Sequence, residues 1–398
     1  MGRLLIRGAR VITPGRDLGV TDVFVDDGRI AAVGGPTPAP CETIDAAGLI
    51  ALPGFIDIHS HGRGGADFCD ATDAAFEKIG RGKLADGVTG FLATGLTRPE
   101  SDLAELCRCV ERYKASRGDA EAQSEGATCL GVHLEGPFFN AEMAGAQNPA
   151  YLKKPDAAMV KRLHAISKVV KVSLAPELEG AETCIRELVA AGIVVSGGHS
   201  AADYDTFERA RQAGMTHLTH FCNAMMPIHH LRPTMVTGGL LADDVFAELI
   251  TDGVHLSDPM IRLIVKAKGP DRVMVITDAM CAAGEPDGIY SLGGLRVKVE
   301  KGKATLADVP YDPKAVVSNV AGSVALYPQC FKRYVRATGL PLEEAVKATS
   351  CNQCRSLGIP DRGEIAPGKI ADIVLVDQDL NPQMTIVNGL RAFPRRTI

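Results

Sequence analysis

The chain contains no tryptophan, no run of basic residues and no long apolar segment. Lysine and arginine total 43 against 48 aspartate and glutamate residues, which gives a net charge of −5. This balance does not suit a surface that binds nucleic acid or an anionic membrane. No window has the length of a membrane-spanning helix, and residues 1–10 lack the apolar centre of a signal peptide. We therefore expect a cytoplasmic protein that binds neither nucleic acid nor membrane.

A disulfide framework is also missing. The eleven cysteines are odd in number and scattered along the chain, unlike the paired cysteines of secreted domains. Cys351 and Cys354 have the C-x-x-C spacing, but no second cysteine or histidine pair lies at the distance typical of a zinc site. We interpret all eleven as ordinary reduced thiols.

With 398 residues, the chain is long enough for one large domain and one smaller one. Alternating apolar and polar residues at both ends predict short strands, and Asp-Gly at 27–28 predicts a hairpin turn. The strands expected there span residues 4–12, 22–33, 371–377 and 384–389. We predict a small β-sandwich domain formed by residues 1–53 together with 361–398.

The middle of the chain alternates strand-like and helix-like segments, a pattern typical of a parallel sheet. The strand-like runs are 55–61, 89–94, 128–135, 170–176, 193–199, 217–222, 247–251 and 273–279. Helical stretches separate most of them, at 74–86, 100–117, 159–167, 184–191, 204–213 and 259–268. Eight such units predict a (β/α)₈ TIM-type barrel over residues 54–360, with its active site at the carboxyl ends of the strands.

Six potential metal ligands lie at the downstream ends of these runs. Any one alone is weak evidence, because a single histidine is usually a core residue and a single acid often caps a helix. All six at the same end of barrel strands predict a metal centre. They are His59, His61, Glu135, His199, His220 and Asp278.

Imidazole and carboxylate ligands favour zinc, with iron, manganese or cobalt as alternatives. A metal ion lowers the pKa of bound water toward ~7 and polarises a carbonyl group. Asp278 would accept the proton of the water and pass it to the leaving group. This chemistry predicts hydrolysis of an amide, an ester or a related C–N bond.

The order of these ligands on a barrel with a divided β-domain resembles the amidohydrolase superfamily. Within it, several segments resemble the N-acetylglucosamine-6-phosphate deacetylase family, and the similarity spans nearly the whole chain. The family hydrolyses the N-acetyl group of a sugar 6-phosphate to acetate and the amino sugar phosphate, and the resemblance implies a homodimer. The matching segments are Leu-Pro-Gly-Phe-Ile-Asp-Ile-His-Ser-His-Gly at 52–62, His-Leu-Glu-Gly-Pro-Phe at 133–138, Gly-Gly-His-Ser at 197–200, Thr-His-Phe-Cys-Asn-Ala-Met at 219–225, Asp-Gly-Val-His at 252–255, Thr-Asp-Ala-Met at 277–280, Gly-Ile-Tyr-Ser-Leu-Gly-Gly at 288–294 and Ala-Gly-Ser at 321–323.

The resemblance also implies roles for individual residues. A main ion would be held by Glu135, His199 and His220. His59 and His61 match family members with two early histidines and imply a second ion, with Asp278 and Glu135 shared. Asp278 matches the catalytic acid/base. The positions that match substrate contacts are Asn223, Ala224, His255, Val320, Ala321 and Gly322.

Two positions depart from the family pattern. Gln147 stands where the family usually has a substrate-contacting histidine, and it cannot carry charge. In the segment that supplies a phosphate-binding arginine, often across a dimer interface, Leu231 occupies the arginine position and Arg232 follows it. We expect Arg232 to contact phosphate if the loop adjusts.

These departures keep other substrates open: N-acetylgalactosamine 6-phosphate, another N-acyl amine or an unphosphorylated amide. A non-catalytic scaffold protein on the same barrel is the remaining alternative, although such a protein would be expected to lack metal ligands.

Overall fold

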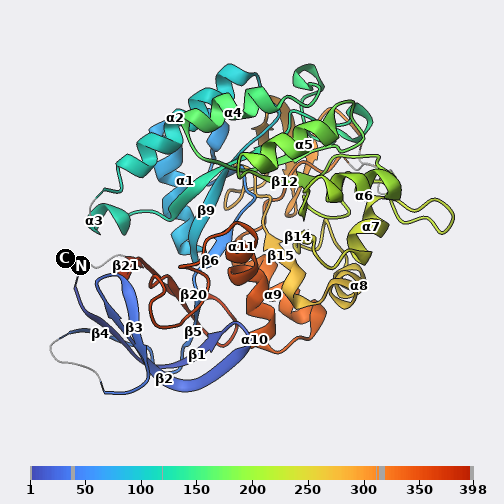
Figure 1. The fold of residues 1–398 in the computed structure, drawn as a ribbon. Coiled ribbons are helices and arrows are strands. Elements are labelled where there is room, and N and C mark those ends of the chain that lie inside the picture. Colours follow the sequence, from blue (N-terminus) through green and yellow to red (C-terminus); the bar gives the residue numbers. More distant parts are fainter. Residues whose placement is uncertain (1, 37–40, 119, 311, 313–318, 395–398) are drawn as a thin grey trace.

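The structure is a computed structural model that describes residues 2–36, 41–118, 120–310, 312 and 319–394. Parts of the expected small domain, at 1, 37–40 and 395–398, lie outside the described residues. Two large sheets organise the chain, one inside a ring of helices and one formed from both ends of the sequence (Figure 1). Among the described helices, none has the length and apolar character needed to cross a membrane.

The inner sheet contains eight parallel strands, each beside the next in chain order. Most of their residues are buried, as expected for strands covered by helices on their outer face. The backbone N–H of Asp278 donates to the carbonyl of His59 at 2.9 Å and so links the ends of the last and first strands. The predicted barrel is confirmed. Its strands are β6 (Phe55–Asp57), β9 (Val88–Gly95), β10 (Thr128–Glu135), β11 (Val169–Leu174), β12 (Val194–Gly197), β13 (His217–Leu218), β14 (Phe246–Ile250) and β15 (Val273–Ile276).

Helices surround the barrel and pack one apolar face on it (Figure 1). Side chains cap several of them: Thr72, Asp156 and Ser257 each accept a backbone N–H of the first turn. The helix after residue 326 was not among the expected segments. The helices are α1 (Asp73–Ala85), α2 (Glu100–Ala115), α3 (Ala120–Gln123), α4 (Ala157–Ile166), α5 (Ala181–Ala190), α6 (Tyr204–Gln212), α7 (Met235–Leu241), α8 (Asp258–Lys268), α9 (Tyr327–Thr338), α10 (Leu342–Ala345) and α11 (Cys351–Ser356).

The second sheet joins the two ends of the chain, because β19 pairs antiparallel with β5. Its core is apolar, and the expected hairpin turn at 27–28 connects two of its strands. Strands from both ends therefore form a sheet of their own, in the order β21 (Leu390–Phe393), β20 (Pro382–Val387), β19 (Ile373–Val376), β5 (Ile50–Pro53), β1 (Leu4–Thr13), β2 (Arg16–Asp26) and β3 (Arg29–Val33), with β4 (Glu42–Asp45) beside β1. The bounds of the small domain stay a prediction.

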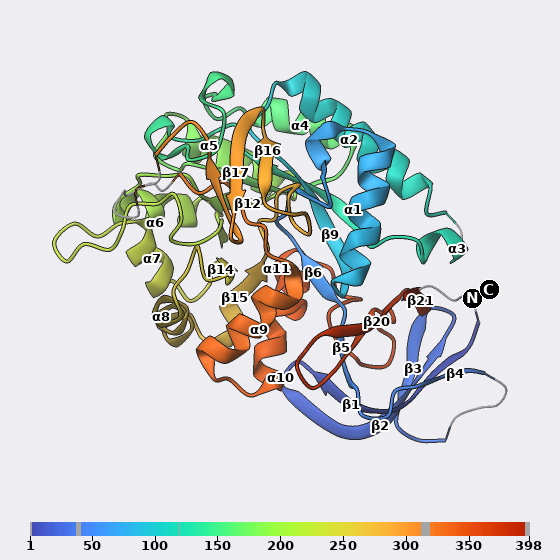
Figure 2. The same cartoon turned by 180° about the vertical axis from the view of Figure 1, so that it is seen from behind.

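Two small sheets lie outside these layers. One is a three-stranded antiparallel sheet that follows β15 and was not expected from the sequence. Figure 2 shows it on the side of the barrel away from the terminal sheet. Its turn brings Leu292 to the pocket at the barrel mouth. The strands are β16 (Gly288–Leu292), β17 (Leu295–Glu300) and β18 (Lys303–Leu306), and the second small sheet pairs β7 (Gly62–Arg63) with β8 (Ala66–Asp67).

Candidate metal centre

The six expected ligands meet at the carboxyl ends of the barrel strands. Glu135 is the last residue of β10, and the other five follow β6, β12, β13 and β15 within a few residues. All six are buried. Short parallel strands ending at one rim explain how residues more than 200 positions apart in sequence come together.

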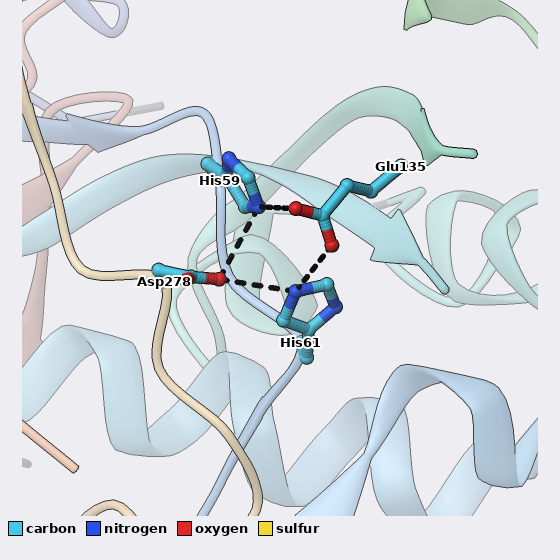
Figure 3. Close-up of side chains that lie close together, drawn as sticks. All are labelled: His59, His61, Glu135 and Asp278. Atoms are coloured by element: carbon cyan, nitrogen blue, oxygen red, sulfur yellow. Dashed lines mark ion pairs between the residues drawn. The ribbon is translucent and has the colours of Figure 1, made fainter. Parts of the chain in front are cut away.

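Four of them form a first group, shown in Figure 3. The Nε2 atom of His59 lies 3.2 Å from an oxygen of Glu135 and 3.2 Å from Oδ1 of Asp278. The Nε2 atom of His61 lies 3.1 Å from the other oxygen of Glu135 and 3.1 Å from the same Oδ1 atom. Two imidazoles and two carboxylates thus point at one small volume.

Glu135 also belongs to a second group with His199 and His220. Its Oε1 atom lies 3.4 Å from Nε2 of His199 and 3.1 Å from Nε2 of His220, and the two Nε2 atoms are 3.0 Å apart. Ligands about 2.1 Å from a tetrahedral ion lie about 3.4 Å from one another, close to these spacings. The carboxylate of Glu135 therefore connects two groups, each with enough donors for one ion.

The electrostatics of the centre also suit a cation. Burial opposes charge on both carboxyls, but the histidines around them hold the pKa of Glu135 and of Asp278 well below the usual range. In return, despite its burial, the carboxylates of Asp278 and Glu135 beside its Nε2 atom raise the pKa of His61 to about 10. Within the described chain, Nε2 of His59 and Oδ1 of Asp278 make no hydrogen bond although they face each other. The residues present fit a divalent metal, which would supply the positive charge that this site stabilises.

Contacts behind the histidines determine which ring nitrogen faces the centre. The Nδ1 atom of His61 lies 3.3 Å from the carbonyl of Thr94, and Nδ1 of His199 lies 2.8 Å from that of Met143. A carbonyl oxygen only accepts, so Nδ1 carries the proton in both rings. In the neutral rings that a metal binds, the Nε2 lone pairs would then point into the centre.

Three of the ligands have strained backbones. His199, His220 and Asp278 have φ angles of +47°, +30° and +50°, in the left-handed region that favours glycine. Such strain costs on the order of 1–3 kcal/mol per residue and is retained where the surrounding structure enforces it, commonly at functional sites. The strain turns these side chains inward immediately after their strands end.

A pocket of about 560 Å³ opens above the two groups. Six of the eight expected substrate-contact positions line it together with five of the ligands, and apolar side chains such as Leu96 and Leu292 complete the wall. The six are Gln147, Asn223, Ala224, His255, Val320 and Gly322.

The remaining two expected positions lie elsewhere. Ala321 is fully buried and does not line the pocket. Arg232 is exposed on a loop that projects beside α6 and α7 (Figure 1), where its nearest polar partner is His229. Of the residues that the structure describes, no lysine or arginine lines this pocket.

Comparison with known proteins identifies the family. The amidohydrolase family pattern matches residues 50–391. An N-acetylglucosamine-6-phosphate deacetylase from Lysinibacillus sphaericus is 35% identical over 392 residues, which cover 97% of this chain and 97% of the relative. This chain belongs to the N-acetylglucosamine-6-phosphate deacetylase family of amidohydrolases. It is therefore a metal-dependent hydrolase that acts on carbon–nitrogen bonds.

Two further relatives of this amidohydrolase bear on its substrate. An N-acetylgalactosamine-6-phosphate deacetylase from Escherichia coli O157:H7 is 33% identical and covers 97% of this chain and 98% of its own length. The structure of a mutant N-acetyl-D-glucosamine-6-phosphate deacetylase from Mycobacterium smegmatis in complex with N-acetyl-D-glucosamine-6-phosphate superimposes with a TM-score of 0.89 at 32% identity, covering 98% of this chain and 100% of that one.

The side chain of Gln147 contacts Glu135, one of the candidate metal ligands, directly. Its side-chain nitrogen donates to Oε2 of Glu135 at 2.6 Å, and its oxygen accepts the backbone N–H of Thr97 at 2.8 Å. The side chain is thus held at both ends and supports the carboxylate shared by the two groups.

Two pocket residues are oriented by neighbours. Asn223 donates its side-chain amide to the carbonyl of His220 at 3.1 Å. The Nδ1 atom of His255 lies 2.8 Å from a carboxylate oxygen of Asp252, and although burial opposes charge, this aspartate raises the pKa of His255. Their roles toward substrate stay predictions.

Sequence reasoning missed two charged residues beneath the ligands. Glu248 in β14 accepts a hydrogen bond from Nδ1 of His59 at 3.0 Å, and Lys171 in β11 donates to the same carboxylate. The available signal was a single charge inside an otherwise apolar strand, because parallel strands of this type are normally apolar throughout.

Proposed function

We propose that this amidohydrolase removes the acetyl group from N-acetylglucosamine 6-phosphate and releases acetate and glucosamine 6-phosphate. The observation that carries the proposal is Asp278, whose carboxylate faces His59 and His61 of one metal-ligand group and lines the pocket at the barrel mouth. Relatives bearing this activity match nearly the whole chain, which supports the same substrate class here.

The cofactor we propose is one or two divalent ions, with zinc first and iron, manganese or cobalt as alternatives. Glu135, His199 and His220 would hold one ion, and His59, His61, Glu135 and Asp278 a second. A bound ion supplies a water of lowered pKa and polarises the acetyl carbonyl.

Asp278 has the position of a general base that becomes a general acid. Its carboxylate takes a proton from the attacking water as the new C–O bond forms at the acetyl carbon. It then delivers that proton to the amide nitrogen as the C–N bond breaks, so that the amine leaves neutral with acetic acid as the other product, which loses its proton to give acetate. Because Asp278 lies at the base of the pocket, this transfer takes place away from bulk water.

Substrate recognition would combine the pocket wall with a second copy of the chain. We infer that Gln147, Asn223, Ala224, His255, Val320 and Gly322 shape the sugar site. Because no lysine or arginine described here lines the pocket, we infer that the phosphate pairs with a cation from outside it. Arg232 on its projecting loop is well placed for a partner's pocket, and Leu231 beside it is 75% exposed, which supports a homodimer.

A cytoplasmic location is part of the same proposal. All eleven cysteines are free, and seven of them are buried. Free thiols persist in a reducing compartment, where phosphorylated sugars also occur.

Acetate release tests the proposal. We expect kcat/KM for N-acetylglucosamine 6-phosphate to exceed that for free N-acetylglucosamine by at least about 10²-fold, because a charge-assisted contact to phosphate is lost in the free sugar. A preference for an unphosphorylated amide would contradict the proposed substrate.

The galactosamine epimer is the second candidate, favoured by the 33% identical relative that acts on it. Measuring both phosphorylated epimers in parallel decides between them. A higher kcat/KM for N-acetylgalactosamine 6-phosphate would replace the leading substrate and leave the hydrolytic chemistry unchanged.

A further inference from the structure

Lys171 and Glu248 form a fully buried charged pair inside the barrel. They lie on β11 and β14, which are separated in the sheet by two strands, so the pair spans the barrel interior. Taking two charges out of water carries a large desolvation penalty, and apolar residues often serve the core equally well. The pair therefore calls for an explanation beyond stability.

The contacts of Glu248 are divided between its two oxygens. Oε1 accepts from the ammonium of Lys171, and Oε2 lies 3.0 Å from Nδ1 of His59. With both oxygens engaged, the carboxylate cannot rotate without breaking a buried hydrogen bond. Figure 3 shows that the other nitrogen of His59 points the opposite way, toward Glu135 and Asp278.

We propose that Glu248, held by Lys171, is a positioning residue that orients His59 as a ligand of one ion only, the ion of the His59, His61, Glu135 and Asp278 group. The inference rests on the proposed metal centre.

Among the described residues, the two histidines of the second ligand group have no comparable side-chain support. A backbone carbonyl, that of Met143, holds His199. Nδ1 of His220 has no hydrogen-bond partner among the described residues. Loss of the Glu248 carboxylate should therefore weaken the binding of one ion and leave the binding of the other unchanged.

The main chain of Glu248 makes a separate hydrogen bond. Its carbonyl accepts the N–H of Phe221 at 2.7 Å, next to His220. A substitution of the side chain leaves this bond intact, so it tests the contact to His59 without altering the main-chain support of the second group.

Two matched double variants separate positioning from structural support. Lys171→Met/Glu248→Gln removes both charges but keeps an oxygen that can accept from His59. Lys171→Met/Glu248→Leu removes the charges and the acceptor at similar volume. The measurements are the dissociation constants of both ions, obtained by titrating metal-free protein with Zn²⁺ against a competing chelator, and the absorption spectrum of the Co²⁺-loaded protein.

We expect the glutamine variant to bind both ions within about threefold of the unmodified protein. The leucine variant should lose about 10- to 100-fold in affinity for one ion, as is usual when the partner behind a metal ligand is removed. The affinity of the leucine variant for the other ion should be unchanged, and the Co²⁺ spectrum should change at one site only. The single variant Glu248→Gln should lose less affinity for the same ion than the leucine variant does. This measurement keeps the inference testable if the leucine variant does not fold.

Equal affinities in the two double variants would overturn the inference, as would an equal loss at both ions. Unmodified protein that binds a single ion, with an affinity indifferent to the leucine substitution, would overturn it as well. Because these titrations read metal and not turnover, failure of the proposed substrate leaves their outcome unaffected and is detected separately by acetate release.

Discussion

The barrel interior and the core of the terminal sheet differ in the kinds of side chain that they bury. The terminal-sheet core consists of aliphatic side chains such as Ile6, Val23 and Ile373, all fully buried. The barrel interior beneath the metal centre buries Lys171, Glu248 and His133 completely. Polar groups at this depth cost free energy, whereas the aliphatic core stabilises the fold by removing apolar surface from water.

Backbone strain follows the same division. At the barrel mouth, His199, His220 and Asp278 have positive φ angles where their side chains enter the centre. In the terminal sheet, Asp27 and Asn388 have positive φ angles in hairpin turns where such angles are normal. The barrel thus stores strain at three of the candidate ligands. Substitutions at the barrel mouth should alter activity more than stability. Substitutions in the core of the terminal sheet should alter stability more than activity.

Metal removal should have the largest effect on the barrel side of this comparison. A chelator should reduce acetate release to background, because the centre supplies the activated water. It should also lower Tm, because an ion that binds only the folded state stabilises it. Activity and Tm before and after restoring Zn²⁺, Fe²⁺, Mn²⁺ or Co²⁺ measure both effects. A chelated protein with full turnover would revive the scaffold alternative.

The Asp278→Asn variant should lower kcat by about 10²–10⁴-fold, because the amide cannot accept the proton of the water. The ion of the Glu135, His199 and His220 group should stay bound and Tm should change little, because Asp278 is not in that group. Steady-state kinetics, metal analysis and a melting curve check this expectation. Near-full activity would show that another group is the base.

Ile373→Ala tests the opposite side of the comparison. Truncating this buried side chain leaves a cavity and should lower the free energy of unfolding by about 2–5 kcal/mol. The kcat of the folded fraction should not change, because Ile373 lies in the terminal-sheet core and not at the centre. Denaturant titration with parallel kinetics measures both quantities. A large fall in kcat at full folding would break the proposed division.

Arg232→Ala should have the smallest effect. We expect KM for the phosphorylated sugar to rise about tenfold, equivalent to about 1.4 kcal/mol, since one charge-assisted contact is lost. The kcat value and the weak activity on the free sugar should not change. Arg209→Ala, another exposed arginine placed on α6, is the matched control and should leave KM unaltered. Equal KM values in both variants would remove Arg232 from phosphate binding.

Much of the barrel could be predicted because parallel strands buried on both faces are continuous apolar runs. All eight expected strands are present, and 128–135 matches β10 at both ends. Others are shorter than expected, such as β13 (His217–Leu218), because the chain turns inward early to present His220. The three-stranded sheet after β15 was missed, since its strands are short and partly exposed and lack that apolar signature.

The metal ligands were identifiable from sequence because they end apolar runs, and strands of one barrel end at a common rim. Family motifs marked the pocket residues in the same way. The contact between Gln147 and Glu135 was not predictable, because it depends on a loop folding back over the strand ends.

The sequence by itself therefore determined the fold class, the family and the six candidate ligands, because periodicity and local motifs encode them directly. Only the tertiary structure decided that Gln147 supports Glu135, that Glu248 and Lys171 lie behind His59, and that Arg232 lies away from the pocket of its own chain. These relations join residues from separate strands and loops, and their distances are defined only once the barrel has formed.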